Sequence, residues 1–191
     1  MAIRFIGVLN AAIWLGSAVF FTFAAAPAFF STDAKALGIS SFYTGSMAQL
    51  VLARYFYVQH ICGLIAVAHL LAEWVYLGRA LQRFTFSLLV VLLCLGFAGG
   101  LWLQPKLKRL NLVRYSMSET KPNQTNSVTT FKLVPIPIEE RTAAEKAFRS
   151  WHPVSIAFNV VVLAGLVFYF WRVTHPPDDL RFVSTPTKFR S

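Results

Sequence analysis

The polar residues best placed to do chemistry lie inside an apolar run, from Tyr55 to Tyr76. On a helix, one stripe about 80° wide holds most of them. The stripe consists of Tyr55, Gln59, Cys62, Ala66, His69 and Glu73. Because polar groups are costly in hydrocarbon, we expect this stripe to face other helices or a water-filled cavity. His60 points about 100° away from Gln59 and lies off the stripe.

A second polar group opens the last apolar run of the chain. His152, Ser155 and Asn159 stand at i, i+3 and i+7, so they share one helix face. His60 and His152 could together ligate haem b or copper if their helices start at the same membrane surface. His60 and His69 could not, because nine residues place them roughly 180° apart. The sequence shows no carboxylate pair and no Ser-His-Asp arrangement, so we predict no catalytic residue.

Four long uncharged runs must position these groups. Of 191 residues, 56% are hydrophobic and 14% are charged, whereas soluble domains carry about 25% charged residues. Each run is long enough to cross a bilayer. The composition therefore predicts an all-α, integral membrane four-helix bundle. The predicted spans are residues 5–30, 55–77, 84–104 and 151–172, with a polar extramembrane loop at 105–150 and a polar tail at 176–191.

The net charge of +10 comes mostly from Lys and Arg residues beside the apolar runs. This arrangement favours anionic lipid headgroups over nucleic acid as partners. We expect a multi-pass protein of a plasma membrane, such as a bacterial inner membrane, with a membrane-protein partner or a second copy as a further possible partner. Cys62 and Cys94 both lie in apolar runs, which argues against a disulfide framework.

Several local signals set the expected helix ends and contacts. Gly96 and Gly100 stand four residues apart in an apolar run, a spacing that favours close helix packing. Tyr55 should open the second helix, after a connector at residues 33–54 whose second half, Met47 to Leu52, could form an interfacial helical turn. Pro153 suits the first turn of the fourth helix, with His152 as its cap. Residues 111–137 are rich in Ser, Thr, Asn, Lys and Pro, which predicts an exposed loop, and Glu139 to Ser150 predict a polar amphipathic helix.

Four spans place both termini on one membrane face, called side A, and the two long connectors on the other, called side B. The polar residues expected near side B are the candidates for a ligand site. These are Arg54, Tyr55, Gln59, His60, Gln104, Lys106, His152, Ser155 and Asn159. The alternative is that they serve as helix caps and interfacial anchors. His69 and Glu73 form a second polar pair nearer side A, suited to a packed hydrogen bond or a proton relay.

Short motifs in all four spans resemble one known family, that of the domain of unknown function 4149, which includes transmembrane protein 205-like sequences. The motifs are Phe23-Ala24-Ala25-Ala26-Pro27-Ala28-Phe29-Phe30, Arg54-Tyr55-Phe56, Gln104-Pro105-Lys106 and His152-x-x-Ser155-x-x-x-Asn159. The resemblance implies a four-helix integral membrane protein without a settled biochemical function. More distantly, the chain is similar to four-helix membrane proteins of the copper-resistance and haem-binding kind.

Three functions remain open from the sequence. The first is a non-enzymatic protein whose side-B cluster binds a small polar ligand, an ion or a partner subunit. Helix N-termini and the cations Arg54 and Lys106 favour an anion or a carbonyl-bearing ligand there. The second is a haem- or copper-binding redox or transport protein that uses His60 and His152. The third is a structural accessory subunit of a membrane complex.

The topology is directly testable. Because the chain has four spans, reporter proteins fused at the N-terminus and after Arg181 should report the same compartment. Reporters that land in opposite compartments would contradict the four-span architecture.

Overall fold

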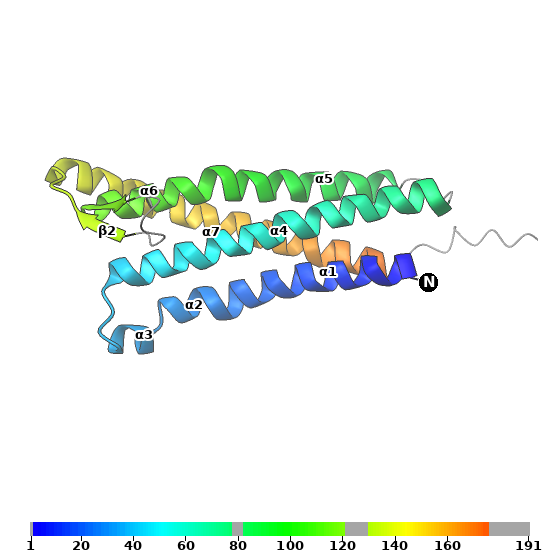
Figure 1. Ribbon diagram of the computed structural model, residues 1–191, viewed down its shortest axis with the longest axis horizontal. Coiled ribbons are helices and arrows are strands. Elements are labelled where there is room, and N and C mark those ends of the chain that lie inside the picture. The colour runs from blue at the N-terminus through cyan, green and yellow to red at the C-terminus, as the bar shows by residue number, and fades with distance from the viewer. Residues whose placement is uncertain (1, 78–81, 121–129, 176–191) are drawn as a thin grey trace, which may run out of the picture.

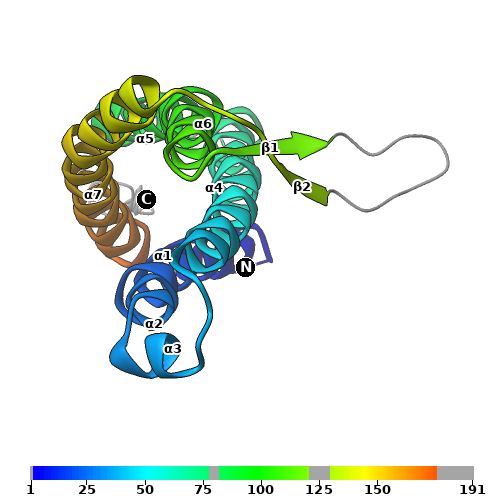
Figure 2. The same cartoon turned by 90° about the vertical axis from the view of Figure 1, so that its left-hand side faces the viewer.

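The chain folds as a ring of four long helices. The computed structural model describes residues 2–77, 82–120 and 130–175, so the predicted tail at 176–191 lies outside the described residues. The N-terminal helix packs against the second and the fourth long helices, and the third packs against the same two. Viewed along the bundle, the four helices follow one another around a ring (Figure 2). The first residues of α1 and the last of α7 lie at the same end (Figure 1).

The elements follow the order of the chain. The first long helix comprises α1 (Ala2–Phe20), the π-helical turn η1 (Phe21–Ala25) and α2 (Ala26–Phe29), and α4 (Ser41–Leu77) follows the short α3 (Thr32–Ala36). The third long helix comprises α5 (Arg83–Phe97), the π-helical turn η2 (Ala98–Leu103) and α6 (Gln104–Arg114). Strands β1 (Met117–Thr120) and β2 (Thr130–Leu133) precede α7 (Ile138–Thr174).

Four of these helices are long and apolar enough to cross a membrane, which confirms the all-α membrane bundle. They also run beyond the predicted spans. At 1.5 Å per residue, the 37 residues of α4 or of α7 extend about 55 Å, against a hydrocarbon core of about 30 Å. The side-B end of the bundle is therefore long enough to project from the membrane.

Two predicted helix starts are wrong. The second helix starts at Ser41 instead of Tyr55, and His152 is not a cap, because α7 begins at Ile138 and Pro153 lies inside it. Both errors have one cause. The start of an uncharged run marks where the chain enters hydrocarbon, but a helix can extend beyond that point into water when its residues favour helix formation. Residues 47–54 contain Met, Ala, Gln, Leu and Arg, which are good helix formers.

The predicted polar loop at 105–150 has regular structure in its described residues, and the helix predicted at Glu139–Ser150 is confirmed as part of α7. It contains most of α6, an antiparallel pairing of β1 with β2 that sets Met117 opposite Leu133, and the first turns of α7. Ser116 has a φ of 54°, which turns the chain from α6 into β1. The two strands point away from the ring (Figure 2). Residues 121–129 of the predicted exposed loop lie outside the part of the chain that the structure describes.

Each π-helical turn lies just before a proline. Pro27 has no amide hydrogen to donate to the carbonyl of Phe23 in η1, and Pro105 has none for Leu101 in η2. A proline ring also clashes with the carbonyl four residues back, so the preceding turn widens. Both widened turns fall in the side-B half of the bundle, one in the first and one in the third long helix.

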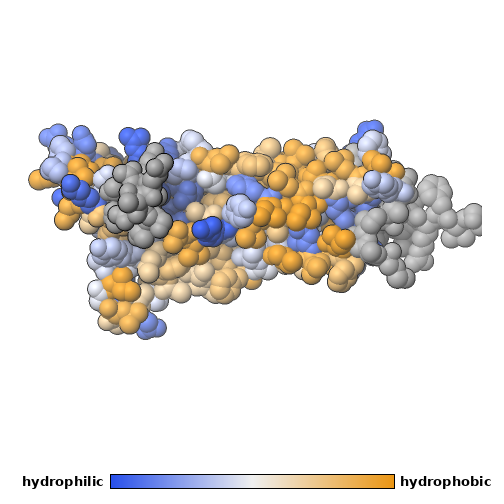
Figure 3. Space-filling view, viewed as in Figure 1, coloured by the Kyte–Doolittle hydropathy of each residue, from blue (hydrophilic) through white to orange (hydrophobic). Residues whose placement is uncertain are grey.

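The predicted polar stripe of the second span faces the bundle interior. Tyr55, Gln59, Cys62 and Ala66 are buried, while His69 and Glu73 are half-buried. They meet a core of Trp14 and Ala18 from α1, Leu89 and Leu92 from α5, and Leu166 and Tyr169 from α7. The outside of the bundle carries large exposed apolar side chains (Figure 3). In a membrane protein this outer surface faces lipid.

The glycine spacing in the third helix marks a close helix contact, as predicted. A Cβ atom on Gly100 would lie 2.9 Å from His60 Cε1 and 3.1 Å from Phe56 Cβ. A Cβ on Gly96 would meet His60 Cδ2 at 3.7 Å. The glycines therefore let the α5–η2 segment approach α4 at the positions of Phe56 and His60.

Replacing Gly100 by Leu should lower the free energy of unfolding by about 1–3 kcal/mol, because a side chain there must displace His60 and Phe56. Thermal unfolding in detergent measures the effect. Gly16→Leu is the matched control, because Gly16 is exposed and a Cβ there meets nothing within 4 Å. Equal melting temperatures for the two variants would contradict the packing role of Gly100.

Candidate functional site

The side-B half of the bundle contains a cavity of about 600 Å³, within the range of small-molecule sites. Residues from η1, α2, α4, α6 and α7 line it, together with Lys35 of α3, Gly96 of α5 and Leu103 of η2. Its polar lining includes Thr22, Gln49, Tyr55, Gln59, Asn111, Arg114, His152, Ser155 and Asn159. Phe21, Leu52, Phe56, Leu103 and Phe158 supply apolar wall. The cavity thus combines polar groups with aromatic and aliphatic surface.

A chain of hydrogen bonds crosses the cavity wall and joins three helices. The Tyr55 hydroxyl donates to Asn159 Oδ1 at 3.0 Å. Asn159 Nδ2 donates to Thr22 Oγ1 at 2.7 Å, and Thr22 Oγ1 donates to the Ala18 carbonyl at 2.7 Å. Phe21 stacks on the Tyr55 ring with centroids 4.5 Å apart. These contacts orient the hydroxyl and amide groups that the cavity presents.

Gln59 lies at the inner end of this polar lining and is 3% exposed. Its Oε1 accepts a hydrogen bond from the Trp14 indole. Its Nε2 is buried, and the side chain interacts with the Tyr55 hydroxyl. The Gln59 amide is therefore held between the Trp14 indole and the Tyr55 hydroxyl.

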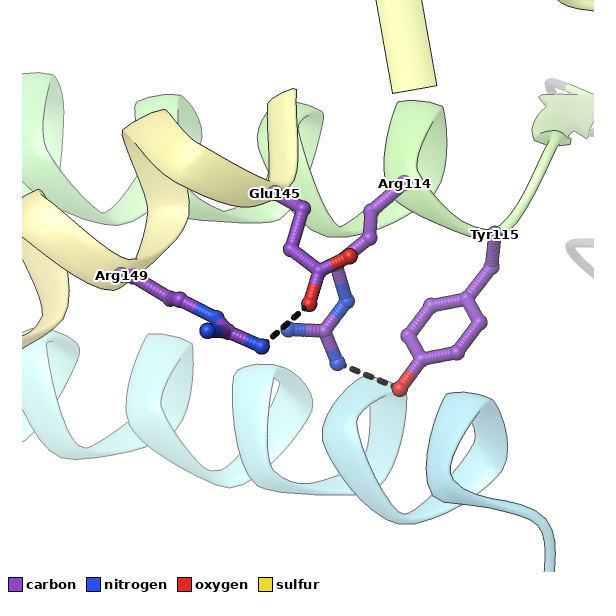
Figure 4. A network of polar contacts seen from close by, with 4 residues as sticks. All are labelled: Arg114, Tyr115, Glu145 and Arg149. Carbon is purple, nitrogen blue, oxygen red and sulfur yellow. Dashed lines mark hydrogen bonds and ion pairs between the residues drawn. The ribbon is translucent and has the colours of Figure 1, made fainter. Parts of the chain in front are cut away.

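The outer part of the cavity is cationic. Arg114 ends α6, donates to the Tyr115 hydroxyl and lies 4.9 Å from the centroid of the Phe148 ring. The positive charge of Arg114 also lies near His152. The His152 ring stacks on Phe148, with centroids 5.6 Å apart. Glu145, the carboxylate drawn in Figure 4, pairs with Arg149 at 2.8 Å. The described lining residues include Lys35 and Arg114 but no Asp or Glu.

Five of the predicted candidates line this cavity: Tyr55, Gln59, His152, Ser155 and Asn159. The other four do not. Arg54 is exposed on α4, and Gln104 is half-buried at the start of α6. Lys106 Nζ lies 3.4 Å from the centroid of the Trp151 ring and 5.0 Å from the centroid of the Trp102 ring. This cation–π arrangement suits a membrane interface.

The structure does not place His60 beside His152. His60 stacks on Phe97 of α5, with centroids 4.5 Å apart, and packs against Gly96 and Gly100. Its Nε2 is buried without a hydrogen-bond partner among the described residues. His152 instead lies on Phe148 and lines the cavity. Within residues 2–77, 82–120 and 130–175, no group of three His, Cys, Asp or Glu side chains converges as a metal site.

The second polar pair lies farther toward side A. His69 packs against the first long helix, where a Cβ on Gly7 would come within 2.4 Å of its ring. Glu73 is half-buried on the same face of α4. Neither residue lines the side-B cavity. The predicted separation of two polar regions along α4 is therefore present in the structure.

Sequence reasoning missed several lining residues, Asn111 and Arg114 above all. The uncharged run ends at Gln104, so the charge pattern predicts a loop for the residues beyond it. Leu107, Asn111 and Arg114 stand at i, i+4 and i+7, so a helix continued through Pro105 would have placed them on one face. Gln49 was missed for the same reason, because it lies in the assumed connector before Tyr55.

Four apolar helices around a polar cavity define a multi-pass membrane protein. A family model, described as a domain of unknown function (DUF4149), matches residues 9–116, and the chain belongs to this family. The matched region covers most of α1 through α6 and excludes α7, which supplies His152, Ser155 and Asn159. No curated protein and no solved structure matches the chain.

Removing the Thr22 hydroxyl should lower the free energy of unfolding by about 0.6 kcal/mol, and by no more than about 1.7 kcal/mol, because Asn159 Nδ2 would lose its acceptor. Thr22→Val therefore should melt at a lower temperature than the wild type in detergent. Thr174→Val is the matched control, since the Thr174 hydroxyl bonds carbonyls of its own helix. Identical melting of the two variants would show that the bond between the helices contributes nothing measurable.

Proposed function

We propose that this protein binds a small ligand in the side-B cavity, without catalysing its conversion. The main support is the lining of this cavity of about 600 Å³, which includes Lys35 and Arg114 but, among the described residues, no Asp or Glu. The Trp14 indole donates to Gln59 Oε1, which orients the Gln59 amide in this lining. A lining that holds cations and no carboxylate favours a ligand with an acceptor atom, such as a carbonyl, carboxylate or phosphate oxygen.

The surrounding polar groups favour the same ligand chemistry. Ser155 and His152 offer further polar atoms on α7, and Arg114 supplies a full positive charge. An anion or a carbonyl compound would therefore meet donors along the cavity. The proposed setting is a plasma membrane, in keeping with the four apolar helices.

The haem or copper alternative has less support. It requires His60 and His152 to approach a single metal, but His60 packs between Phe97 and the glycines of the α5–η2 segment. A shared site would need His60 to leave that contact. The described residues show no contact that would favour a structural accessory role over ligand binding.

Filling the cavity tests the proposal. Ser155 lines the cavity and is half-buried, so Ser155→Phe should occupy ligand space while leaving the hydrogen bonds of Tyr55 and Asn159 in place. Native mass spectrometry of protein purified in mild detergent should show a small-molecule adduct on the wild type. We expect Ser155→Phe to reduce the adduct about tenfold or more.

Ser87→Phe is the control, because Ser87 is exposed on α5 and does not line the cavity. It should retain the wild-type adduct. The proposed function is wrong if the wild type carries no adduct, or if Ser155→Phe retains as much adduct as Ser87→Phe.

A further inference from the structure

The lining residues that are also exposed show where the cavity reaches the outer surface. Ile156 and Val160 line the cavity, yet they are 54% and 53% exposed on the outside of α7. On the facing side, Pro27 and Phe30 line it, and Phe30 is 54% exposed. A residue that lines the cavity and also reaches the outer surface marks an opening. The cavity therefore opens between α7 and the end of the first long helix.

The widened turn η1 lies next to this opening. The first long helix packs on α7 through α1, but among the described residues no packing of comparable extent joins α2 to α7. Pro27 widens the helix just before α2. Beyond η1, toward side B, the first long helix therefore packs less on α7 than α1 does, and the opening lies beside Ile156 and Val160.

The opening between α7 and the first long helix faces lipid, while the exposed lining residues Lys35, Ser41 and His152 open the outer end of the cavity at the side-B surface. Trp151 marks the expected side-B interface of α7, in contact with Trp102 and Lys106. Ile156 lies five residues deeper, or roughly 8 Å, and Val160 lies roughly 14 Å deeper. The exposed lining residues at this depth, Ile156, Val160 and Phe30, are apolar, as expected for a surface in contact with acyl chains.

The cavity changes in character along its length. Its outer end has Arg114, His152 and Lys35, whereas Phe21, Phe56 and Phe158 form partly buried wall deeper in the bundle. On α7 the lining extends from Phe148 to Val162, roughly 21 Å of helix. Arg114 has five N–H donors, and the described structure shows one nitrogen bonded to Tyr115, which leaves donors for an anion.

We propose that the cavity takes a single-chain acidic amphiphile from the bilayer. Its anionic head, a carboxylate or a phosphate, lies at Arg114 and His152, and its acyl chain lies among Phe21, Phe56 and Phe158. This inference rests on the proposed function and names the ligand class. The cationic outer end favours an acidic head, and the apolar wall favours an acyl chain. The opening at membrane depth provides a route into the cavity from the bilayer.

Competition binding tests the ligand class. The protein is placed in phosphatidylcholine nanodiscs, and binding of radiolabelled palmitate is measured against empty nanodiscs. Palmitate should bind, and palmitoyl lysophosphatidic acid should compete with it. Glycerol monopalmitate has the same chain and a neutral head, so it should compete at least about tenfold more weakly. Acetate and inorganic phosphate, which are heads without a chain, should not compete.

Two pairs of variants test the placement. Arg114→Gln should weaken palmitate binding about tenfold, the loss expected for a hydrogen bond to a charged group, whereas Arg109→Gln, exposed on the same helix, should not. Val160→Trp should obstruct the opening and lower binding. Val161→Trp should not, because Val161 is exposed but does not line the cavity. Wild-type melting temperatures for Arg114→Gln and Val160→Trp would exclude unfolding as the cause.

Each contrary result has a distinct meaning. Equal competition by palmitate and glycerol monopalmitate, with no effect of Arg114→Gln, overturns the acidic head. Competition by acetate or phosphate as strong as that by palmitate overturns the acyl chain and indicates a water-soluble anion. Equal binding by the Val160→Trp and Val161→Trp variants overturns the lateral route. If palmitate does not bind while the native adduct is lost in Ser155→Phe, the amphiphile is wrong and the proposed function stands.

Discussion

The bundle depends on satisfying polar groups where no water competes for them. Tyr55, Asn159 and Thr22 join α4, α7 and the first long helix through two hydrogen bonds, and Trp14 joins α1 to Gln59. Such bonds between membrane helices contribute on average about 0.6 kcal/mol each, so they add little to stability singly. Their geometry is strict, however, and it fixes how each helix is rotated about its own axis.

That rotation decides which residues meet inside the ring. With Tyr55 and Gln59 turned inward, His60 must turn toward α5, since adjacent residues on a helix point about 100° apart. Gly96 and Gly100 then provide the space that the His60 ring needs. The same rotation directs Ser155 and Asn159 into the cavity. The hydrogen bonds that orient the helices therefore also assemble the candidate site.

Prolines explain why the cavity lies in the side-B half. Pro27 and Pro105 follow widened turns in two of the four helices, and widened turns frequently occur at functional sites. Elsewhere in the ring small residues keep the helices close: a Cβ on Gly63 would lie 2.5 Å from Leu93, and one on Gly165 would lie 2.8 Å from Leu92. One part of the bundle is closely packed, and the other is spread enough to hold a ligand.

The sequence by itself determined the class of fold. Four uncharged runs, the inward stripe of Tyr55, Gln59, Cys62 and Ala66, and the Gly96 and Gly100 contact all follow from composition and from the 3.6-residue period. These features are local, because each depends on one helix and on its need to hide polar groups from hydrocarbon. The grouping of Tyr55 with Ser155 and Asn159 on side B was also predictable, since it needs only the order and direction of the spans.

Tertiary structure decided what lies beyond the membrane boundary and which helix faces which. Hydropathy does not distinguish a helix that leaves the membrane from a loop, so Gln49, Asn111 and Arg114 were assigned to connectors although they line the cavity. It also gives no relative rotation between helices, so His60 was grouped with His152 although it packs on Phe97. Rotation and length depend on contacts between segments far apart in the chain. Those contacts exist only once the four helices have packed together.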